Sequence, residues 1–249
     1  MSGHSKWHNI RLRKGKQDAV RGAKFTKLAR EIIIAAKAGG GNPDANLRLR
    51  FAIQKARENS MPADKIKNAI QRGTGEIEGA NYDEITYEGY GPAGVAVLVE
   101  CATDNRNRTV ADLRNIFNKN GGRLGENGSV AWMFDARKGL IVVSNTVTDE
   151  DTLLGIALDA GAEDVKTVDE GFEVYTVPGD LGKVVEALEA AGIKTLSSEV
   201  IMQPNNTVKV DGKEASQTLR LMDMLEEHDD VQSVHANFDI PDEVLESVS

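Results

Sequence analysis

The chain has 249 residues, of which 40% are hydrophobic and 28% are charged, and its formal net charge at pH 7 is −9. This composition is typical of a soluble globular protein of two or three domains and excludes disorder along the whole chain. A single cysteine, Cys101, excludes an intrachain disulfide and a cysteine-based zinc site. The sequence contains no apolar run long enough for a membrane helix and no signal peptide, so we expect a cytoplasmic protein.

Charge is divided unevenly along the chain. Residues 1–80 contain 17 Lys and Arg against 7 Asp and Glu, a net charge of +10, whereas residues 81–249 contain 13 against 32, a net charge of −19. Residues 1–30, which we call the basic head, contain nine cations and one carboxylate, Asp18. A polymer of phosphates is the natural partner of such a segment, and the acidic remainder would favour one docking orientation by repelling the same polymer.

The first eighty residues predict three helices. Apolar residues recur at helical spacing over residues 25–36, and Gly39-Gly40-Gly41 ends that helix. Asn42 is the expected cap of a second helix, because a proline and an aspartate follow it. Pro62 opens a third helix, for which Gly73 is the expected left-handed cap. Together the three helices would bury a shared core and leave their cations outside.

Beyond residue 80 the apolar period changes from 3.6 to 2. Residues 85–101 predict a hairpin, residues 105–121 a helix and residues 129–134 a strand. Residues 137–203 then predict β-α-β-β-α-β, the order of a ferredoxin-like unit. The remainder supplies a strand at residues 207–210, a helix around residues 214–227 and a strand at residues 231–238. Joined to residues 94–135, these complete a second β-α-β-β-α-β unit, which neither half could form alone.

The predicted fold class is therefore α+β, with an N-terminal three-helix bundle followed by two ferredoxin-like α/β domains, the last inserted into the other. The expected boundaries are residues 1–78 for the basic helical bundle, 79–136 with 204–249 for the discontinuous α/β domain, and 137–203 for the inserted ferredoxin-like domain. A simple linear succession of domains is the competing layout.

Little in the sequence suggests catalysis or metal binding. His4 and His8 lie four residues apart, as two metal ligands on one helical face would, but no carboxylate or thiol flanks them. We interpret them as polar residues of a terminal segment. The sequence has no nucleophile elbow, no phosphate loop of the Gly-Lys-Ser/Thr type and no His-Glu-x-x-His motif. We therefore expect no enzyme, no metal and no organic cofactor.

The candidate nucleic-acid contacts lie in the basic head and in a second cluster, Asp104 to Thr109. This second cluster joins a strand end to a helix start, where free backbone N–H groups favour anions, so two arginines there could clamp a phosphate. Alternatively, Asp104 or Asn105 caps the helix and both arginines are solvated. Trp7 offers a ring for base stacking, although packing against the bundle is the commoner role of a lone aromatic. The candidate contacts are Lys6, Trp7, Arg11, Arg13, Lys14, Lys16, Arg21, Lys24, Lys27, Arg30, Arg106 and Arg108.

Many short strings along the chain resemble the YebC family. They include Gly3-His4-Ser5-Lys6-Trp7, Arg21-Gly22, Phe25-Thr26-Lys27-Leu28, Asn42-Pro43, Tyr87-Glu88-Gly89-Tyr90-Gly91-Pro92, Asp104-Asn105-Arg106-Asn107-Arg108-Thr109 and Gly128-Ser129-Val130. The resemblance covers essentially the whole chain and its motifs are specific. Ala23 is a departure, because the family often has a lysine after Arg-Gly; Lys24 follows directly, so little charge is lost.

The resemblance implies a helical first domain, two α/β domains and no catalysis. Bacterial members of the family are described as DNA-binding transcriptional regulators. Mitochondrial relatives act as translational activators, and some bacterial members help ribosomes past proline-rich stretches. DNA and ribosomal RNA present the same phosphates, and no reading helix of the helix-turn-helix kind stands out. The residues therefore support backbone binding without strong sequence reading.

We expect from the sequence a monomeric, cytoplasmic, DNA-binding transcriptional regulator that is no enzyme and has no membrane contact. The alternative in the same class is a ribosome-associated translation factor that binds ribosomal RNA and relieves stalling at proline-rich stretches. An alternative of another class is a small-molecule sensor, because paired ferredoxin-like units can bind ligands between their sheets.

Overall fold

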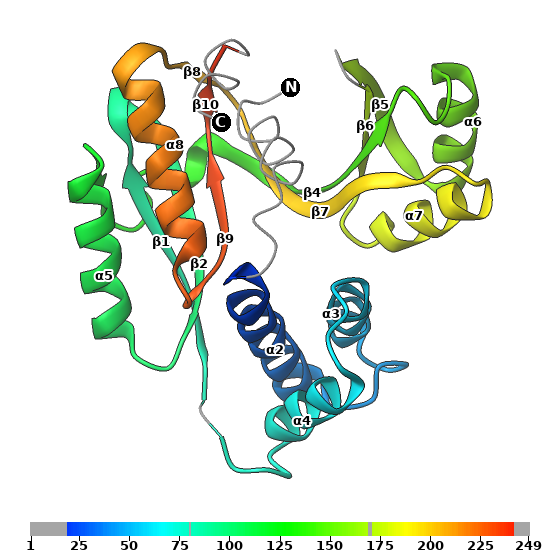
Figure 1. Cartoon of the computed structure of the whole chain (residues 1–249), viewed down its shortest axis with the longest axis horizontal. Helices are drawn as coiled ribbons and strands as arrows, with labels where there is room; N and C mark the ends of the chain where they lie inside the picture. The colour runs from blue at the N-terminus through cyan, green and yellow to red at the C-terminus, as the bar shows by residue number, and fades with distance from the viewer. Residues whose placement is uncertain (1–18, 80, 169–170, 242–249) are drawn as a thin grey trace. The chain divides into compact units, whose positions relative to one another are not determined.

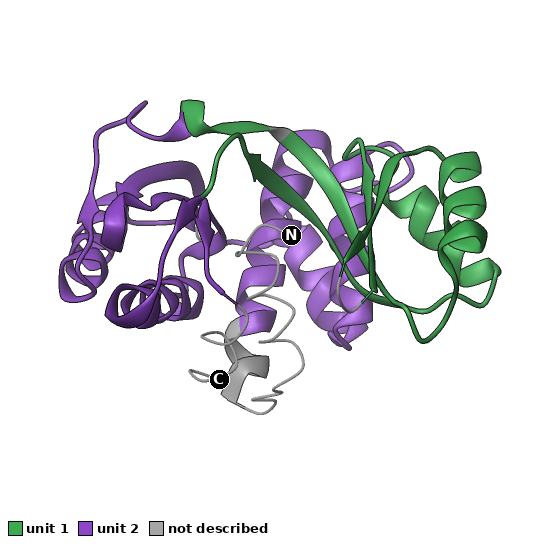
Figure 2. Cartoon of the chain, turned by 90° about the horizontal axis from the view of Figure 1, so that it is seen from above, with its two compact units in different colours: residues 1–9, 132–207 green, residues 10–131, 208–249 purple. Residues whose placement is uncertain are grey.

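The computed structural model describes residues 19–241 except residues 80 and 169–170, with side chains from Lys24 onward except that of Ala136 (Figure 1). Of these residues, 132–207 form one compact unit, which we call unit 1, and the others form unit 2 (Figure 2). Each unit contains its own four-stranded sheet. The predicted α+β class is confirmed.

Three helices form a bundle in unit 2. They are α2 (Ala19–Gly39), α3 (Leu47–Glu58) and α4 (Ala63–Thr74). Ile32 of α2 and Leu49 of α3 are fully buried in their shared core, which small alanines and further aliphatic side chains complete. The three predicted helices are therefore present, and their apolar faces supply the driving force for the bundle.

The sequence pattern predicts Asn42 as the N-terminal cap of α3, but in the structure the cap is Asn46. The Asn46 Oδ1 atom accepts the Leu49 N–H at 3.0 Å, and its Nδ2 atom donates to the Ala35 carbonyl at 2.8 Å. Asn42 instead accepts the Asp44 N–H at 3.0 Å, which closes a local turn before the helix. The helix starts one turn later than predicted, because Asn46 caps α3 and ties its start to the end of α2 at the same time.

Gly73, the predicted cap of α4, lies inside that helix. The cap is Gly75, which has a φ of 82°. A Cβ atom on Gly73 would lie 2.5 Å from the Ile33 carbonyl oxygen and 2.6 Å from the Ala36 Cβ atom. Glycine at position 73 thus lets α4 approach the backbone of α2.

Replacing Gly73 with alanine is expected to lower the free energy of unfolding by about 1–3 kcal/mol, because α2 and α4 must separate to accommodate the methyl group. Gly155→Ala in α6 (Glu150–Ala160) is the matched control, since a Cβ atom there meets nothing within 4 Å. We expect the control to be neutral or to stabilise by up to about 1 kcal/mol. Urea denaturation followed by circular dichroism measures both; equal effects would contradict the close approach.

An antiparallel sheet forms the rest of unit 2. Helices α5 (Arg106–Lys119) and α8 (Gly212–Glu227) cover one of its faces (Figure 1). Because β9 pairs with β2, the sheet joins a chain segment that precedes unit 1 in the sequence to one that follows it. In sheet order its strands are β3 (Arg123–Leu124), β1 (Asp83–Tyr90), β2 (Ala96–Thr103) and β9 (Val231–Ala236).

The sheet of unit 2 differs from the predicted unit at two of its four places. In the ferredoxin-like order 2-3-1-4, β2 and β9 hold places 1 and 4 as predicted, but β3 holds place 2 instead of the strand predicted at residues 129–134, and β1 holds place 3. The strand predicted at residues 207–210 is β8 (Val208–Lys209), which pairs in parallel with β10 (Phe238–Asp239). The eight-residue β1 takes the place because its hairpin pairs it with β2 along its whole length.

Unit 1 has the ferredoxin-like order throughout, with sheet order β5-β6-β4-β7 and antiparallel pairs. Ile141 and Val174 of the sheet pack with Leu153 and Leu188 of its two helices. The domain boundaries given above stay a prediction. The elements after α6 are β5 (Ala162–Val168), β6 (Gly171–Thr176), α7 (Leu181–Ala190) and β7 (Thr195–Pro204), and β4 (Phe134–Ser144) precedes it.

Residues 129–133, predicted as a strand, do not form one. The N–H groups of Gly128, Val130 and Ala131 donate to the Glu88 carboxylate at 2.6, 2.7 and 2.8 Å. A side chain thus satisfies the donors that a neighbouring strand would otherwise bind. A short 3-10 helix, η2 (Ala131–Met133), follows, and β4 begins at Phe134.

Candidate nucleic-acid interface

Half of the predicted contacts lie outside the described residues: Lys6, Trp7, Arg11, Arg13, Lys14 and Lys16. Arg21 lies in α2, but its side chain is not described. The others are Lys24, Lys27 and Arg30 on α2, and Arg106 and Arg108 at the start of α5. The assignment of all twelve residues to nucleic acid stays a prediction.

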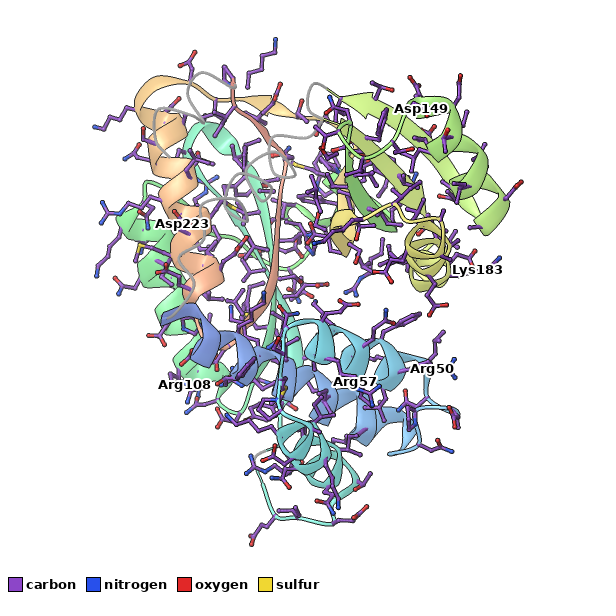
Figure 3. All side chains as sticks on the ribbon, turned by 45° about the vertical axis from the view of Figure 1, so that its right-hand side comes forward. Arg50, Arg57, Arg108, Asp149, Lys183 and Asp223 are labelled. Atoms are coloured by element: carbon purple, nitrogen blue, oxygen red, sulfur yellow. The ribbon has the colours of Figure 1, made fainter. Side chains whose placement is uncertain are left out.

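Exposed cations gather on the helices of the bundle. Partial burial of the Lys24 ammonium, and secondarily the positive charge of Lys55 on α3, lower the pKa of Lys24. The Lys55 Nζ atom lies 3.9 Å from the Glu31 carboxylate. Arg57 is exposed and has no ion pair with any side chain in the described part of the chain. Lys24, Lys55 and Arg57, which we call the bundle cations, are therefore available to an anionic partner. Figure 3 labels Arg57 on α3.

Two arginines of the bundle have structural roles that leave them less available. Arg50 donates to the carbonyls of Pro43 and Asp44 at 3.1 and 3.0 Å, and so holds the turn before α3. Arg48 forms an exposed ion pair with Glu84, with one Nη1 to Oε2 distance of 3.0 Å. These contacts distinguish them from the bundle cations.

Lys27 and Arg30 contact the sheet part of unit 2. The Lys27 ammonium donates to the Glu226 carbonyl near the end of α8, where the helix dipole favours a cation. The Arg30 Nη1 atom donates to the Asp230 carboxylate at 2.8 Å and to the Ala102 carbonyl at 3.3 Å. Only 11% of the Arg30 side chain is exposed. Its guanidinium is therefore held inside the molecule.

Asp230 is the buried centre of a cluster that also includes Arg30, Thr103, Thr109 and the half-exposed Arg108; we call it the Asp230 clasp. The carboxylate accepts hydrogen bonds from Arg108 at 2.9 Å, Thr109 at 2.7 Å and Thr103 at 3.2 Å. Burial raises the pKa of Asp230, but the hydrogen bonds from Arg108 and Thr109 and the charges of both arginines outweigh this effect, so its pKa lies below the usual value. The clasp joins α2 to the sheet part of unit 2.

The arginines at the start of α5 have internal partners. The Arg106 Nε atom lies 3.0 Å from Asp83, and the Arg108 Nη2 atom lies 2.8 Å from Asp104. Hydrogen bonds to the clasp aspartate and to Asp104 raise the pKa of Arg108. Asn105 caps α5 by accepting the Arg108 N–H at 3.1 Å, as the structural alternative expects. A phosphate would compete with these carboxylates for both guanidinium groups.

Sequence reasoning missed Asp230, because nothing local distinguishes it. Its only local signal is an acidic pair, Asp229-Asp230, immediately before the apolar strand β9. The bundle cations were counted in the charge of residues 1–80, but Lys55 and Arg57 were not singled out.

Other kinds of site find little support. Among the residues that the structure describes, no three His, Cys, Asp or Glu side chains are placed to hold a metal ion. His4 and His8 lie outside those residues. Within the same part of the chain, no helix combines the length and the apolar character needed to span a membrane. Burial raises the pKa of the Cys101 thiol to about 12, which makes it a poor nucleophile at neutral pH.

The fold is that of a multidomain α+β protein. It has a three-helix bundle, a sheet built from segments before and after unit 1 in the sequence, and a ferredoxin-like unit. The basic helices come first in the chain, and the acidic, sheet-rich parts follow them. A family model described as "TACO1/YebC protein N-terminal domain" matches residues 5–76, and one described as "TACO1/YebC second and third domain" matches residues 82–238. The chain belongs to the TACO1/YebC family, and the resemblance seen in the sequence is confirmed.

Relatives agree with this assignment over their full length. A protein of Pelotomaculum thermopropionicum is 57% identical over 97% of this chain and 100% of its own. One of Dictyoglomus turgidum is 55% identical over 100% of both chains. Both are named "Probable transcriptional regulatory protein", a name for a regulator and not for an enzyme. The crystal structure of a conserved hypothetical protein from Aquifex aeolicus is similar, with a TM-score of 0.80, 47% identity and coverage of 92% of this chain and 94% of that one.

Proposed function

We propose that this protein is a DNA-binding transcriptional regulator whose basic N-terminal part contacts the phosphate backbone. The segregation of charge carries the proposal: residues 1–80 have a net charge of +10 and residues 81–249 one of −19. The names of the relatives support the regulatory role. Phosphate contacts of this kind supply affinity and orientation, whereas base contacts supply sequence specificity.

The proposed contacts are the basic head and the bundle cations. Lys27, Arg30, Arg106 and Arg108 are secondary, because each already has a carbonyl or carboxylate partner. Among the described residues, Lys24 and Arg57 have no carboxylate partner, and Lys55 has only the 3.9 Å contact with Glu31. We therefore expect the main phosphate contacts on α2 and α3, and weaker contacts at the arginines at the start of α5.

Ribosomal RNA is the second candidate, because a phosphate-binding surface does not by itself distinguish the two polymers. Arg48 and Arg50 have intramolecular partners, which favours binding of the nucleic-acid backbone over reading of bases by α3. If ribosomal RNA is the target, the protein would be a ribosome-associated translation factor. Affinity for duplex DNA and for structured ribosomal RNA is therefore measured in parallel.

Replacing Lys14, Lys16 and Arg21 with glutamate is expected to weaken nucleic-acid binding by about tenfold or more, because ion release from phosphates dominates such binding. The same replacement of Lys24, Lys55 and Arg57 tests the bundle cations. The control replaces three exposed cations outside the bundle, Lys183, Lys194 and Lys209, and changes the net charge equally. Fluorescence anisotropy over a series of salt concentrations gives the affinity and its salt dependence.

The salt slope of the wild-type protein is expected to exceed that of the head variant, since fewer phosphates are neutralised in the variant. Thermal unfolding checks that all variants fold. If the head and bundle variants bind as tightly as the control, the basic N-terminal part is not the contact surface. If the loss appears only with ribosomal RNA, the translation-factor candidate replaces the DNA-binding one.

A further inference from the structure

Helix α6 of unit 1 has one buried side and one exposed side. Asp149, which Figure 3 labels, caps the helix by accepting the Thr152 N–H at 2.9 Å. Leu153 and Ala157 are fully buried, and they pack with the sheet of unit 1. The core of the unit uses this side of the helix, so the opposite side can be considered as a binding surface.

The exposed side of α6 has two adjacent ridges of residues, each with a spacing of four. Leu154 is 36% exposed and Leu158 is 45% exposed, although both are apolar. They share one ridge with an acidic residue, and the second ridge has a glycine between two acidic residues. All six residues are exposed, and we call them the α6 outer face: Glu150, Leu154 and Leu158 on one ridge, and Asp151, Gly155 and Asp159 on the other.

Two residues of the α6 outer face are unfavourable for the helix itself. Gly155 lies in the middle of the helix, where glycine lowers stability relative to alanine, although a Cβ atom there would meet nothing within 4 Å. Asp159 lies in the last turn, where the helix dipole disfavours a negative charge. A partner that comes close at Gly155 and supplies a positive charge at Asp159 would account for both residues.

Acidic residues surround the two exposed leucines. Residues 145–165 include six Asp and Glu and no Lys or Arg. Within the described part of the chain, the carboxylates of Glu150, Asp151 and Asp159 form no ion pair. Glu150 and Asp151 also favour the start of the helix, but together with Asp159 they make the outer face negative. This face would attract cations and repel the phosphates of nucleic acid.

We propose that the α6 outer face binds a basic amphipathic helix of another protein. An apolar side chain of this partner helix enters the hollow at Gly155 and contacts Leu154 and Leu158, as a knob enters the hole formed by residues i, i+3, i+4 and i+7 of a helix. Lysines or arginines one turn on either side of it face Asp151 and Asp159. This is recognition of a helix by its apolar face, with charge pairs that fix its position.

A second copy of this chain fits the surface less well than a basic partner. Packing of α6 against α6 of another copy would place Asp151 and Asp159 close to the same two carboxylates in either helix direction, and like charges oppose such a contact. A contact of about two helical turns is smaller than a standard protein interface, so we expect weak binding, with a Kd of about 10–100 μM. The partner is therefore expected to form a transient complex.

Three fluorescent peptides test the proposal against the whole chain, freed of nucleic acid. Each is alanine-rich and has about 15 residues, a length at which an isolated helix can form. The basic peptide has leucines on one face and lysines beside them, the acidic peptide has glutamate in place of each lysine, and the shuffled peptide has the basic composition without the helical period. Fluorescence anisotropy is expected to show binding of the basic peptide, with the other two at least about tenfold weaker.

Filling the hollow tests the close approach at Gly155. Gly155→Gln is expected to weaken binding of the basic peptide by about tenfold, because its side chain occupies the space that the partner's apolar side chain enters. The matched control is Ala190→Gln, which adds the same side chain at an exposed position of α7 and leaves the affinity unchanged. Thermal unfolding checks that both variants fold.

Reversing the charges tests the choice of a basic partner. Asp151→Lys with Asp159→Lys is expected to reverse the preference, so that the acidic peptide binds about tenfold or more tightly than the basic one. The control is Glu186→Lys with Glu189→Lys, which changes the charge equally at exposed positions of α7 and keeps the preference for the basic peptide.

Three outcomes overturn the proposal. Absence of saturable binding of the basic peptide up to about 1 mM protein would show that the face does not bind such a helix. Equal affinity for the basic and shuffled peptides would show attraction by charge alone. Equal effects of the α6 variants and their α7 controls would place the binding site elsewhere. None of these results depends on nucleic-acid binding, so they are independent of the function proposed above.

Discussion

Replacing Asp230 with alanine is expected to lower the free energy of unfolding of unit 2 by about 3–5 kcal/mol, because it removes one partner of a buried ion pair and leaves Arg30 without its counter-charge. The Asp230 side chain is 2% exposed and that of Arg30 is 11% exposed. The fully buried Thr103 loses its carboxylate acceptor at the same time, whereas the Thr109 hydroxyl can still donate to the Asn105 carbonyl at 3.0 Å. Urea denaturation measures the loss.

The control for this experiment is Asp104→Ala. Asp104 pairs with the same arginine, Arg108, but it is exposed, so the expected loss is about 1 kcal/mol or less. A double-mutant cycle of Asp230→Ala with Arg30→Ala isolates the coupling between the bundle and the sheet part. Hydrogen exchange of the α2 amides should rise in Asp230→Ala if the clasp holds this helix. Equal losses for Asp230→Ala and Asp104→Ala would show that the clasp contributes no more than a surface pair.

Replacing Glu88 with alanine is expected to cost about 3–5 kcal/mol, because the buried carboxylate is the acceptor for three backbone N–H groups and each unsatisfied group costs about 1–3 kcal/mol. The side chain is 7% exposed. Glu88→Gln keeps one acceptor oxygen, so its loss should be smaller. Glu84→Gln on the same strand is the control, since the exposed Glu84–Arg48 pair contributes little. Similar losses at both positions would contradict the role of Glu88.

The same carboxylate makes stability depend on pH. Burial raises the pKa of Glu88, but the hydrogen bonds from the Gly128, Val130 and Ala131 N–H groups outweigh it, so its pKa in the folded protein lies below the usual value. The stabilisation is therefore fully present above the unfolded-state pKa of about 4.3 and is lost as the pH falls through the lower folded-state pKa. Asp230, whose pKa is also lowered, acts in the same direction. Urea denaturation from neutral to acidic pH should show a steeper loss in the wild-type protein than in Glu88→Gln.

Local patterns were sufficient for most of the secondary structure. The apolar stripes of α2 to α4 are periodic in the chain itself, and this period reports which face of a helix is buried. The continuous apolar run at residues 140–143 likewise marks β4 as a buried strand. The ferredoxin-like order of unit 1 follows from the succession of its elements, because short connections leave few ways to pair the strands. The separation of positive and negative charge is likewise a property of composition.

Contacts between distant segments decided the rest. Asn46 displaced Asn42 as the cap because it also reaches the end of α2, and β1 took the place expected for β8 because its hairpin offers more pairs. Arg30 and Arg108 bear the same charge as the other predicted contacts, but the fold brings Asp230 between them. A charged side chain in a sequence carries no record of its eventual partner, since Coulomb attraction acts through space and not along the chain. The tertiary structure therefore distinguishes the cations that have carboxylate or carbonyl partners inside the protein from those that stay exposed on the helices of the bundle.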